Sequence, residues 1–154
     1  MEEIDFKRRI SVARLRAQMS SAVENIVNHV RIFGKVLGEI VECGAYKAGT
    51  AMALTAASDW YWSESKKVFA FDTFCGYPNG DCEGLDPKQF SDVDFEEVKR
   101  ATENLKNLVL VKGEFKETIP RFEPRPLSIL FLDCDLYESY MVALKKFWPL
   151  LNKG

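Results

Sequence analysis

The chain has 154 residues and a formal net charge of -2, with 47% hydrophobic and 29% charged residues. This length suits one domain with a sizeable core, and the composition excludes a disordered chain. The near-neutral charge gives no electrostatic reason to expect nucleic acid or an anionic membrane as a partner.

The N-terminus and the cysteines favour a cytoplasmic protein. No apolar run is long enough to span a bilayer, and the first five residues are acidic where a secretory signal would be basic. Cys43 and Cys134 lie in apolar runs, whereas Cys75 and Cys82 lie in a loop without the C-x-x-C spacing of a metal or redox site. We therefore expect a structural or incidental role for all four.

No repeat, low-complexity tract or linker divides the chain, so we expect a single domain over residues 1–154. Residues 1–36 predict an N-terminal helical segment, because apolar side chains recur at helical spacing and Gly34 suits a helix stop. These apolar residues are Ile10, Leu15, Met19, Val23, Ile26, Val27, Val30 and Phe33.

After this segment, short apolar runs alternate with helical stretches. The runs cover residues 39–43, 68–71, 108–111 and 128–132, and the helical stretches cover 50–62, 95–105, 117–122 and 137–151. Continuous apolar runs are typical of strands buried on both faces of a parallel sheet. The alternation predicts an α/β fold with a Rossmann-like, doubly wound parallel sheet, in which ligands bind beyond the carboxyl ends of the strands.

Two glycines follow the first predicted strand. Gly44 would allow a tight turn and a close approach to a ligand, and Gly49 would open the next helix. The free N–H groups at that helix start, with the Thr50 hydroxyl, favour a carboxylate or phosphate. The spacing is not the G-x-G-x-x-G of dinucleotide-binding proteins, and an ordinary tight turn remains an alternative.

The second and third strands are also followed by candidate ligand-binding residues. Asp72 is placed to accept hydrogen bonds from the ribose hydroxyls of an adenosine, unless it is simply a solvated strand-end aspartate. Its charge disfavours a 2′-phosphorylated cofactor. In the segment 112–120, Phe115 could cover an adenine ring or could equally be a core residue.

Two carboxylates follow the fourth strand. Asp133 and Asp135 are hard oxygen ligands of the kind that suits Mg²⁺ or a similar divalent ion. Alternatively, one of them, more readily Asp135, caps the helix that begins near Tyr137. His29, the single histidine, lies on the N-terminal helical segment, where nothing favours a catalytic base over an ordinary helix position.

With these segments in view, the chain resembles class I S-adenosylmethionine-dependent O-methyltransferases from about residue 38 to residue 154. The stretch 41–50 is similar to the glycine-rich motif of catechol-type and macrocin-type enzymes. The stretches 71–78, 112–120 and 132–139 point to the macrocin-type family, which methylates sugar hydroxyls during antibiotic biosynthesis. The resemblance implies methyl transfer to a hydroxyl of a small molecule, such as a sugar or glycosylated natural product, with S-adenosylmethionine and Mg²⁺.

The resemblance also implies roles for individual residues. Gly44 and Thr50 would hold the methionine part of the cofactor, and Glu42 would position the turn. Asp133 would be catalytic, as a metal ligand close to the transferred methyl group, with Asp135 as a second ligand. The implied cofactor-binding set is Glu42, Gly44, Ala45, Tyr46, Gly49, Thr50, Asp72, Thr73, Gly113, Phe115 and Asp133.

The chain departs from the family pattern in two ways. Ala48 stands where the family often has a second glycine, and the chain stops at Gly154, before a fifth strand whose acidic pair would supply the remaining metal ligands. A strand order 3-2-1-4 with the C-terminal strands missing would leave the fourth strand at an open, apolar edge. We therefore expect either a homo-oligomer that pairs through this region or a truncated version of a longer protein.

Two other functions remain open from the sequence. The Asp133-Cys-Asp135 segment could be the metal-binding DxD of a glycosyltransferase-like protein that uses a nucleotide sugar, although the glycine turn and Asp72 suit an adenosine better. Alternatively, the chain could be a non-catalytic module that binds S-adenosylmethionine without transferring its methyl group. The aromatic-rich loop 73–95 could cover the acceptor in an enzyme.

Overall fold

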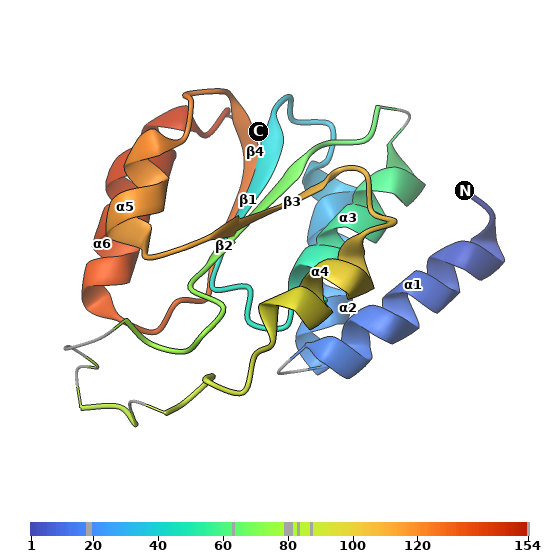
Figure 1. Cartoon of the computed structure of the whole chain (residues 1–154). Coiled ribbons are helices and arrows are strands. Elements are labelled where there is room, and N and C mark those ends of the chain that lie inside the picture. Colours follow the sequence, from blue (N-terminus) through green and yellow to red (C-terminus); the bar gives the residue numbers. More distant parts are fainter. Residues whose placement is uncertain (18–19, 63, 79–81, 83, 87, 154) are drawn as a thin grey trace.

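A parallel sheet forms the centre of the molecule (Figure 1). The computed structural model describes residues 1–17, 20–62, 64–78, 82, 84–86 and 88–153. Its strands are β1 (Glu39–Cys43), β2 (Val68–Asp72), β3 (Leu108–Lys112) and β4 (Leu127–Leu132). They pair in the order β3-β2-β1-β4, and every pair is parallel, which confirms the predicted topology.

Helices cover both faces of this sheet, as Figure 1 shows. One face carries α1 (Glu3–Arg16), α2 (Ser20–Phe33), α3 (Gly49–Tyr61) and α4 (Phe95–Thr102). The other carries α5 (Phe115–Thr118), the 3-10 turn η1 (Ile119–Arg121), α6 (Tyr137–Phe147) and the 3-10 turn η2 (Trp148–Leu150). This two-sided cover explains why the strands are continuously apolar in sequence.

The N-terminal segment consists of two helices. The backbone of Ala17 is extended, with φ -71° and ψ 142°, so α1 ends at Arg16 although the apolar period continues beyond it. Met19 lies outside the described residues. Val23 and Val30 on α2 are fully buried, as core residues of an amphipathic helix should be, whereas Leu15 on α1 is 87% exposed.

The predicted helix ends shift by a few residues. The helix predicted over residues 95–105 ends at Thr102. The helical stretch predicted over residues 117–122 corresponds to α5 followed by η1. The last predicted helix, 137–151, ends at Phe147, and η2 follows with Pro149 near its start. A proline there removes a backbone donor and favours a tighter turn.

Separate apolar clusters fill the two sides of the sheet. On the α6 side, Phe147 is fully buried, with its ring centroid 5.5 Å from that of Phe71 and 5.3 Å from that of Phe122. On the α2 and α3 side, Leu54 packs in a cluster with Val30 and other buried aliphatic side chains. Both clusters fix the strands, so the turns at their carboxyl ends have a rigid support.

The sheet ends at β4 on one side. Leu151 forms a parallel bridge with Leu127, and the Asn152 N–H donates to the Leu127 carbonyl at 2.8 Å. The chain after η2 therefore runs alongside the beginning of β4, while residues 128–132 are half-buried.

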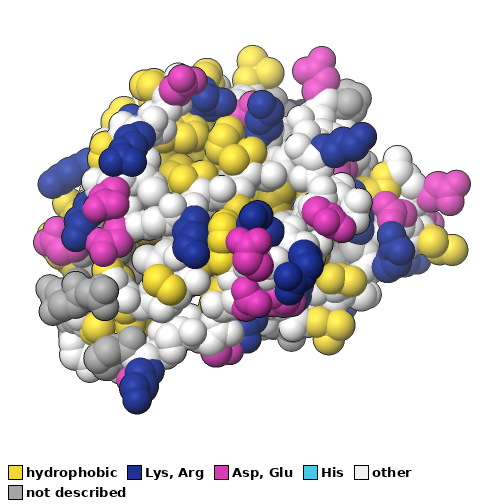
Figure 2. Space-filling view, viewed as in Figure 1, with side chains coloured by type: hydrophobic (Ala, Val, Ile, Leu, Met, Phe, Trp, Pro, Cys, Tyr) yellow, Lys and Arg dark blue, Asp and Glu magenta, His cyan; other side chains and the backbone are white. Residues whose placement is uncertain are grey.

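Charged side chains of both signs are interspersed on the face shown in Figure 2, in keeping with the small net charge of -2. Within the described ranges, no helix combines the length and the apolar character needed to cross a membrane.

Candidate functional site

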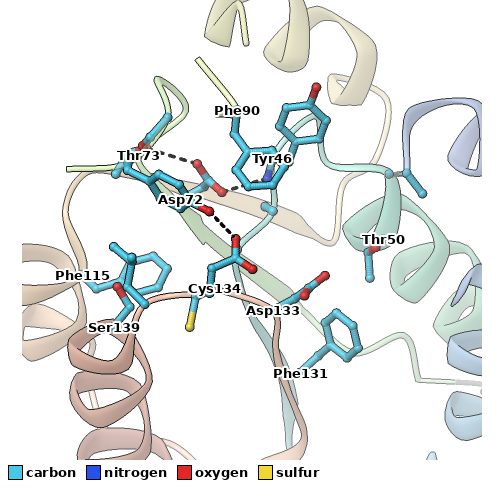
Figure 3. Close-up of a pocket in the computed structure, with 18 of the residues that line it drawn as sticks. Tyr46, Thr50, Asp72, Thr73, Phe90, Phe115, Phe131, Asp133, Cys134 and Ser139 are labelled. Atoms are coloured by element: carbon cyan, nitrogen blue, oxygen red, sulfur yellow. Dashed lines mark hydrogen bonds between the residues drawn. The ribbon is translucent and has the colours of Figure 1, made fainter. Parts of the chain in front are cut away.

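The turns after β1, β2 and β4 meet around a cavity of about 200 Å³ (Figure 3). The cavity lies at the topological switch point between β1 and β4, where the strand order reverses. This is the usual ligand position in open α/β sheets. The predicted site residues that line it are Gly44, Ala45, Tyr46, Gly49, Thr50, Asp72, Thr73, Phe115, Asp133 and Asp135. Glu42 and Gly113 are the predicted residues outside this lining.

Gly44 is required because the turn after β4 passes directly against it. Its φ is +97°, and a Cβ at this position would lie 1.9 Å from the carbonyl oxygen of Asp133. The Asp133 N–H in turn donates to the Cys43 carbonyl at 2.9 Å. A glycine is therefore the residue that lets the β1 and β4 turns meet at the floor of the cavity.

The rest of the β1 turn holds two residues in the left-handed region. Tyr46 has φ +48° and Ala48 has φ +61°, and Ala48 is the N-cap residue of α3. Alanine thus adopts the conformation that glycine would favour at this position, which explains how the turn forms without the second glycine.

Asp72 ties the β1 turn to the β2 turn. Its Oδ2 accepts a hydrogen bond from the Tyr46 N–H at 2.8 Å, and its Oδ1 accepts one from the Phe74 N–H at 2.6 Å. Burial raises the pKa of this carboxyl, and the backbone hydrogen bonds oppose that shift. Asp72 is therefore not a freely solvated strand-end aspartate.

Glu42 lies under the cavity and is fully buried. Neither of its carboxylate oxygens has a hydrogen-bond partner among the described residues. Burial, followed by the charges of Asp72 and Asp133, raises its pKa well above the ordinary value of 4.5. Burial therefore favours the protonated side chain, because an unpaired buried carboxylate would be very unfavourable.

Asp133 and Asp135 project from the β4 turn into the cavity. Burial and the nearby charge of Asp135 raise the pKa of Asp133. Asp135 has φ +59°, and its Oδ2 accepts a hydrogen bond from the Tyr77 hydroxyl at 3.0 Å. The N-cap of α6 is Leu136, so neither aspartate occupies the capping position.

Beside these two aspartates, the described residues offer no third side chain suited to a metal ion. Among the residues that the structure describes, no group of three or more His, Cys, Asp or Glu side chains could hold a metal ion. His29 is exposed on α2, with its Nδ1 2.6 Å from the Asn25 carbonyl oxygen, and it does not line the cavity.

Phe115 lies between the cavity and the core. It lines the cavity and also packs against the core cluster on the α6 side. Gly113 has φ +141°, which favours glycine at this position, and it does not line the cavity.

Several lining residues were not predicted as site residues. Phe90 contacts Tyr46 and Tyr77 with ring centroids 5.3 and 5.7 Å apart, and these rings form an aromatic wall. The aromatic-rich loop was the sequence signal for this wall. Arg16 and Ala17 from the end of α1 also line the cavity, and no local sequence pattern indicates their position.

Residues 9–154 match the macrocin-O-methyltransferase (TylF) family. The chain belongs to this family. The macrocin-family chain is also 27% identical to the 8-demethyl-8-(2,3-dimethoxy-alpha-L-rhamnosyl)-tetracenomycin-C 4'-O-methyltransferase of Streptomyces olivaceus, over 77% of this chain and 51% of that protein. It is 26% identical to the demethyldecarbamoylnovobiocin O-methyltransferase of Streptomyces niveus, over 94% of this chain and 58% of that protein.

Solved structures of two methyltransferases have a similar fold. The O-methyltransferase NovP superposes with a TM-score of 0.72 and 26% identity, over 86% of this chain and 61% of NovP. The calicheamicin methyltransferase CalS11 shares the fold, with a TM-score of 0.68 and 19% identity over 98% of this chain and 74% of CalS11. The macrocin-family chain thus spans between half and three-fifths of the curated relatives' length.

Proposed function

We propose that this chain binds S-adenosylmethionine in the cavity and takes part in methyl transfer to a hydroxyl of a sugar or glycosylated natural product. The observation that carries the proposal is the meeting of the β1, β2 and β4 turns at one cavity. Family membership and the names of the two Streptomyces relatives support this acceptor class. They do not favour a nucleotide-sugar glycosyltransferase.

The cavity residues fit the parts of the cofactor. The free N–H groups at the start of α3 and the Thr50 hydroxyl suit the methionine carboxylate. Asp72 Oδ2 accepts the Tyr46 N–H and has a second lone pair for a ribose hydroxyl, whereas Oδ1 accepts from both the Phe74 N–H and the Thr73 hydroxyl. Phe115 offers an apolar face to the adenine ring on the opposite side of the cavity from Thr50 (Figure 3).

The proposed reaction is a direct displacement. The acceptor oxygen forms a bond to the methyl carbon, the carbon–sulfur bond breaks, and the hydroxyl proton passes to a base. S-adenosylmethionine supplies the activated methyl group, and the protein supplies alignment. Asp133 lines the cavity and is our candidate catalytic residue, as a ligand of the metal ion proposed below.

We further propose that Asp133 and Asp135 bind Mg²⁺, which commonly takes one or two protein carboxylates and keeps several waters. The bound ion would orient the acceptor and lower the pKa of its hydroxyl. The Tyr77 hydroxyl holds the Asp135 carboxylate in place for this role.

Isothermal titration calorimetry with S-adenosylhomocysteine tests cofactor binding. Asp72→Asn should weaken binding at least tenfold, because the ribose loses a charged acceptor. Asp86→Asn is the matched control, since Asp86 also accepts from the backbone N–H two residues on, but at an exposed position. Heat with UDP-sugars and none with S-adenosylhomocysteine would contradict the proposal.

Transfer of a radiolabelled methyl group to a panel of glycosides, with and without Mg²⁺, tests the reaction. We expect labelled glycoside and a higher rate with Mg²⁺. Cofactor binding without transfer to any acceptor would instead favour a non-catalytic binding module.

A further inference from the structure

The end of α1 is joined to the β1 turn and to α4 by one side chain. The Arg16 Nε donates to the Lys47 carbonyl at 3.0 Å. Its Nη1 and Nη2 donate to Glu97 Oε1 and Oε2 at 2.7 and 3.3 Å, which makes a two-pronged ion pair. The Arg16 side chain is only 16% exposed, so this pair is shielded from water on one side.

The bond to Lys47 fixes a peptide plane in the turn. The carbonyl of the 47–48 peptide accepts from Arg16, and the Ala48 N–H of the same peptide donates to the Ala45 carbonyl at 2.7 Å. This peptide directly precedes α3, so its orientation determines where the free N–H groups of that helix point. The flanking residues Tyr46 and Ala48 both have left-handed backbone angles, which are unfavourable for residues with a Cβ. Such a turn keeps its shape only where its surroundings hold it.

A second contact joins the same two parts of the chain. A Cβ on Gly49 would lie 2.2 Å from the backbone nitrogen of Ala17 and 2.6 Å from the carbonyl carbon of Arg16. Gly49 is therefore needed for the close approach of the α1 end to the start of α3, in addition to opening that helix. Arg16 and Ala17 line the same cavity as Thr50.

We propose that Arg16 is a positioning residue that holds the β1 turn in its ligand-binding shape from the N-terminal segment, with Glu97 as its anchor on α4. The inference rests on the proposed function for the identity of the ligand. An arginine suits this position because it bonds the carbonyl through Nε while its two Nη atoms engage a carboxylate, which a lysine cannot do.

The test compares Arg16→Gln with Arg14→Gln. Arg14 lies on the same helix and pairs with Glu24 at an exposed position, so its replacement removes an ion pair without touching the turn. We expect Arg16→Gln to weaken S-adenosylhomocysteine binding about tenfold, or about 1.4 kcal/mol. In the ligand-free protein, it should also speed amide hydrogen exchange within residues 45–50. Arg14→Gln should change neither quantity.

The double variant Arg16→Glu with Glu97→Arg separates positioning from simple stabilisation. It restores an ion pair between α1 and α4 but not the bond to the Lys47 carbonyl. We expect it to regain the melting temperature lost in Arg16→Gln while its ligand affinity stays low.

Two results would overturn the inference. The first is unchanged exchange of the turn amides in Arg16→Gln, and the second is full recovery of affinity in the double variant. If the unaltered chain gives no heat with S-adenosylhomocysteine, the proposed function fails, and the exchange comparison still decides the role of Arg16.

Discussion

Glu42 makes the stability of the protein depend on pH in a way that one substitution can isolate. Its pKa is raised well above 4.5 in the folded state, mainly because the side chain is fully buried. Folding therefore takes up a proton at any pH between the unfolded and folded pKa values. The stabilisation is complete below about pH 4.5 and is lost as the pH rises toward the folded value.

Glu42→Gln removes this titration and keeps the shape of the side chain. Between pH 4.5 and the folded-state pKa of Glu42, the free energy of unfolding of the unaltered chain should fall relative to that of the variant. The expected slope is about 1.4 kcal/mol per pH unit. The raised pKa values of Asp72 and Asp133 contribute to both proteins and cancel to first order in the difference. Urea unfolding at pH 5, 6 and 7 measures the difference directly.

The control is Glu103→Gln, which replaces an exposed glutamate and should show no pH-dependent difference of this size. Parallel stability curves for Glu42→Gln and the unaltered chain would refute the reasoning. They would mean that Glu42 is ionised in the folded protein and that its charge is compensated.

Three further substitutions, with Gly84→Ala as the control for the first, test the packing and the site. Gly44→Ala should cost about 3 kcal/mol or more, because its Cβ would meet the Asp133 carbonyl at 1.9 Å. Gly84→Ala, at φ +84° with no described atom within 4 Å, should cost only the 1–2 kcal/mol or so of backbone strain, and equal losses in urea unfolding would contradict this. Phe147→Ala should lose about 3–5 kcal/mol of stability, and a melting curve close to that of the unaltered chain would show that the aromatic cluster does not stabilise the fold. Tyr77→Phe should lower kcat for methyl transfer and leave S-adenosylhomocysteine affinity unchanged, so a loss confined to affinity would count against its role beside the β4 aspartates.

The sheet could be predicted from sequence because its signal is local. Each strand contains a short, mostly apolar run, and β1 and β2 are buried on both faces, as is typical of a parallel sheet. The break after Arg16 could not be predicted, because the apolar period continues past it. Contact between Ala17 and Gly49 accompanies this break, and such a contact between distant segments leaves no periodic trace.

In the site, too, residues with a local sequence signal could be predicted, and residues placed by contacts between distant segments could not. Asp72, Asp133 and Asp135 could be found because the carboxyl ends of parallel strands share one edge of the sheet. Arg16 and Phe90 reach the cavity from segments outside those strand ends, so their positions depend on tertiary packing. The ligand roles of all these residues remain predictions that the binding experiments test.

The cavity is built from the turns that follow β1, β2 and β4, and β1 and β4 are the two strands at the topological switch point. Consequently, a ligand bound there cannot be retained once any of these strands separates from its neighbour. A ligand bound in the cavity should therefore protect the sheet as a unit from opening, and its effect should not be confined to a single loop. At a free ligand concentration of 100 times Kd, this linkage adds about 2.7 kcal/mol to the free energy of global unfolding. Amides of β1, β2 and β4 should gain protection together, which would make the bound cofactor a structural element of the domain as well as its methyl donor.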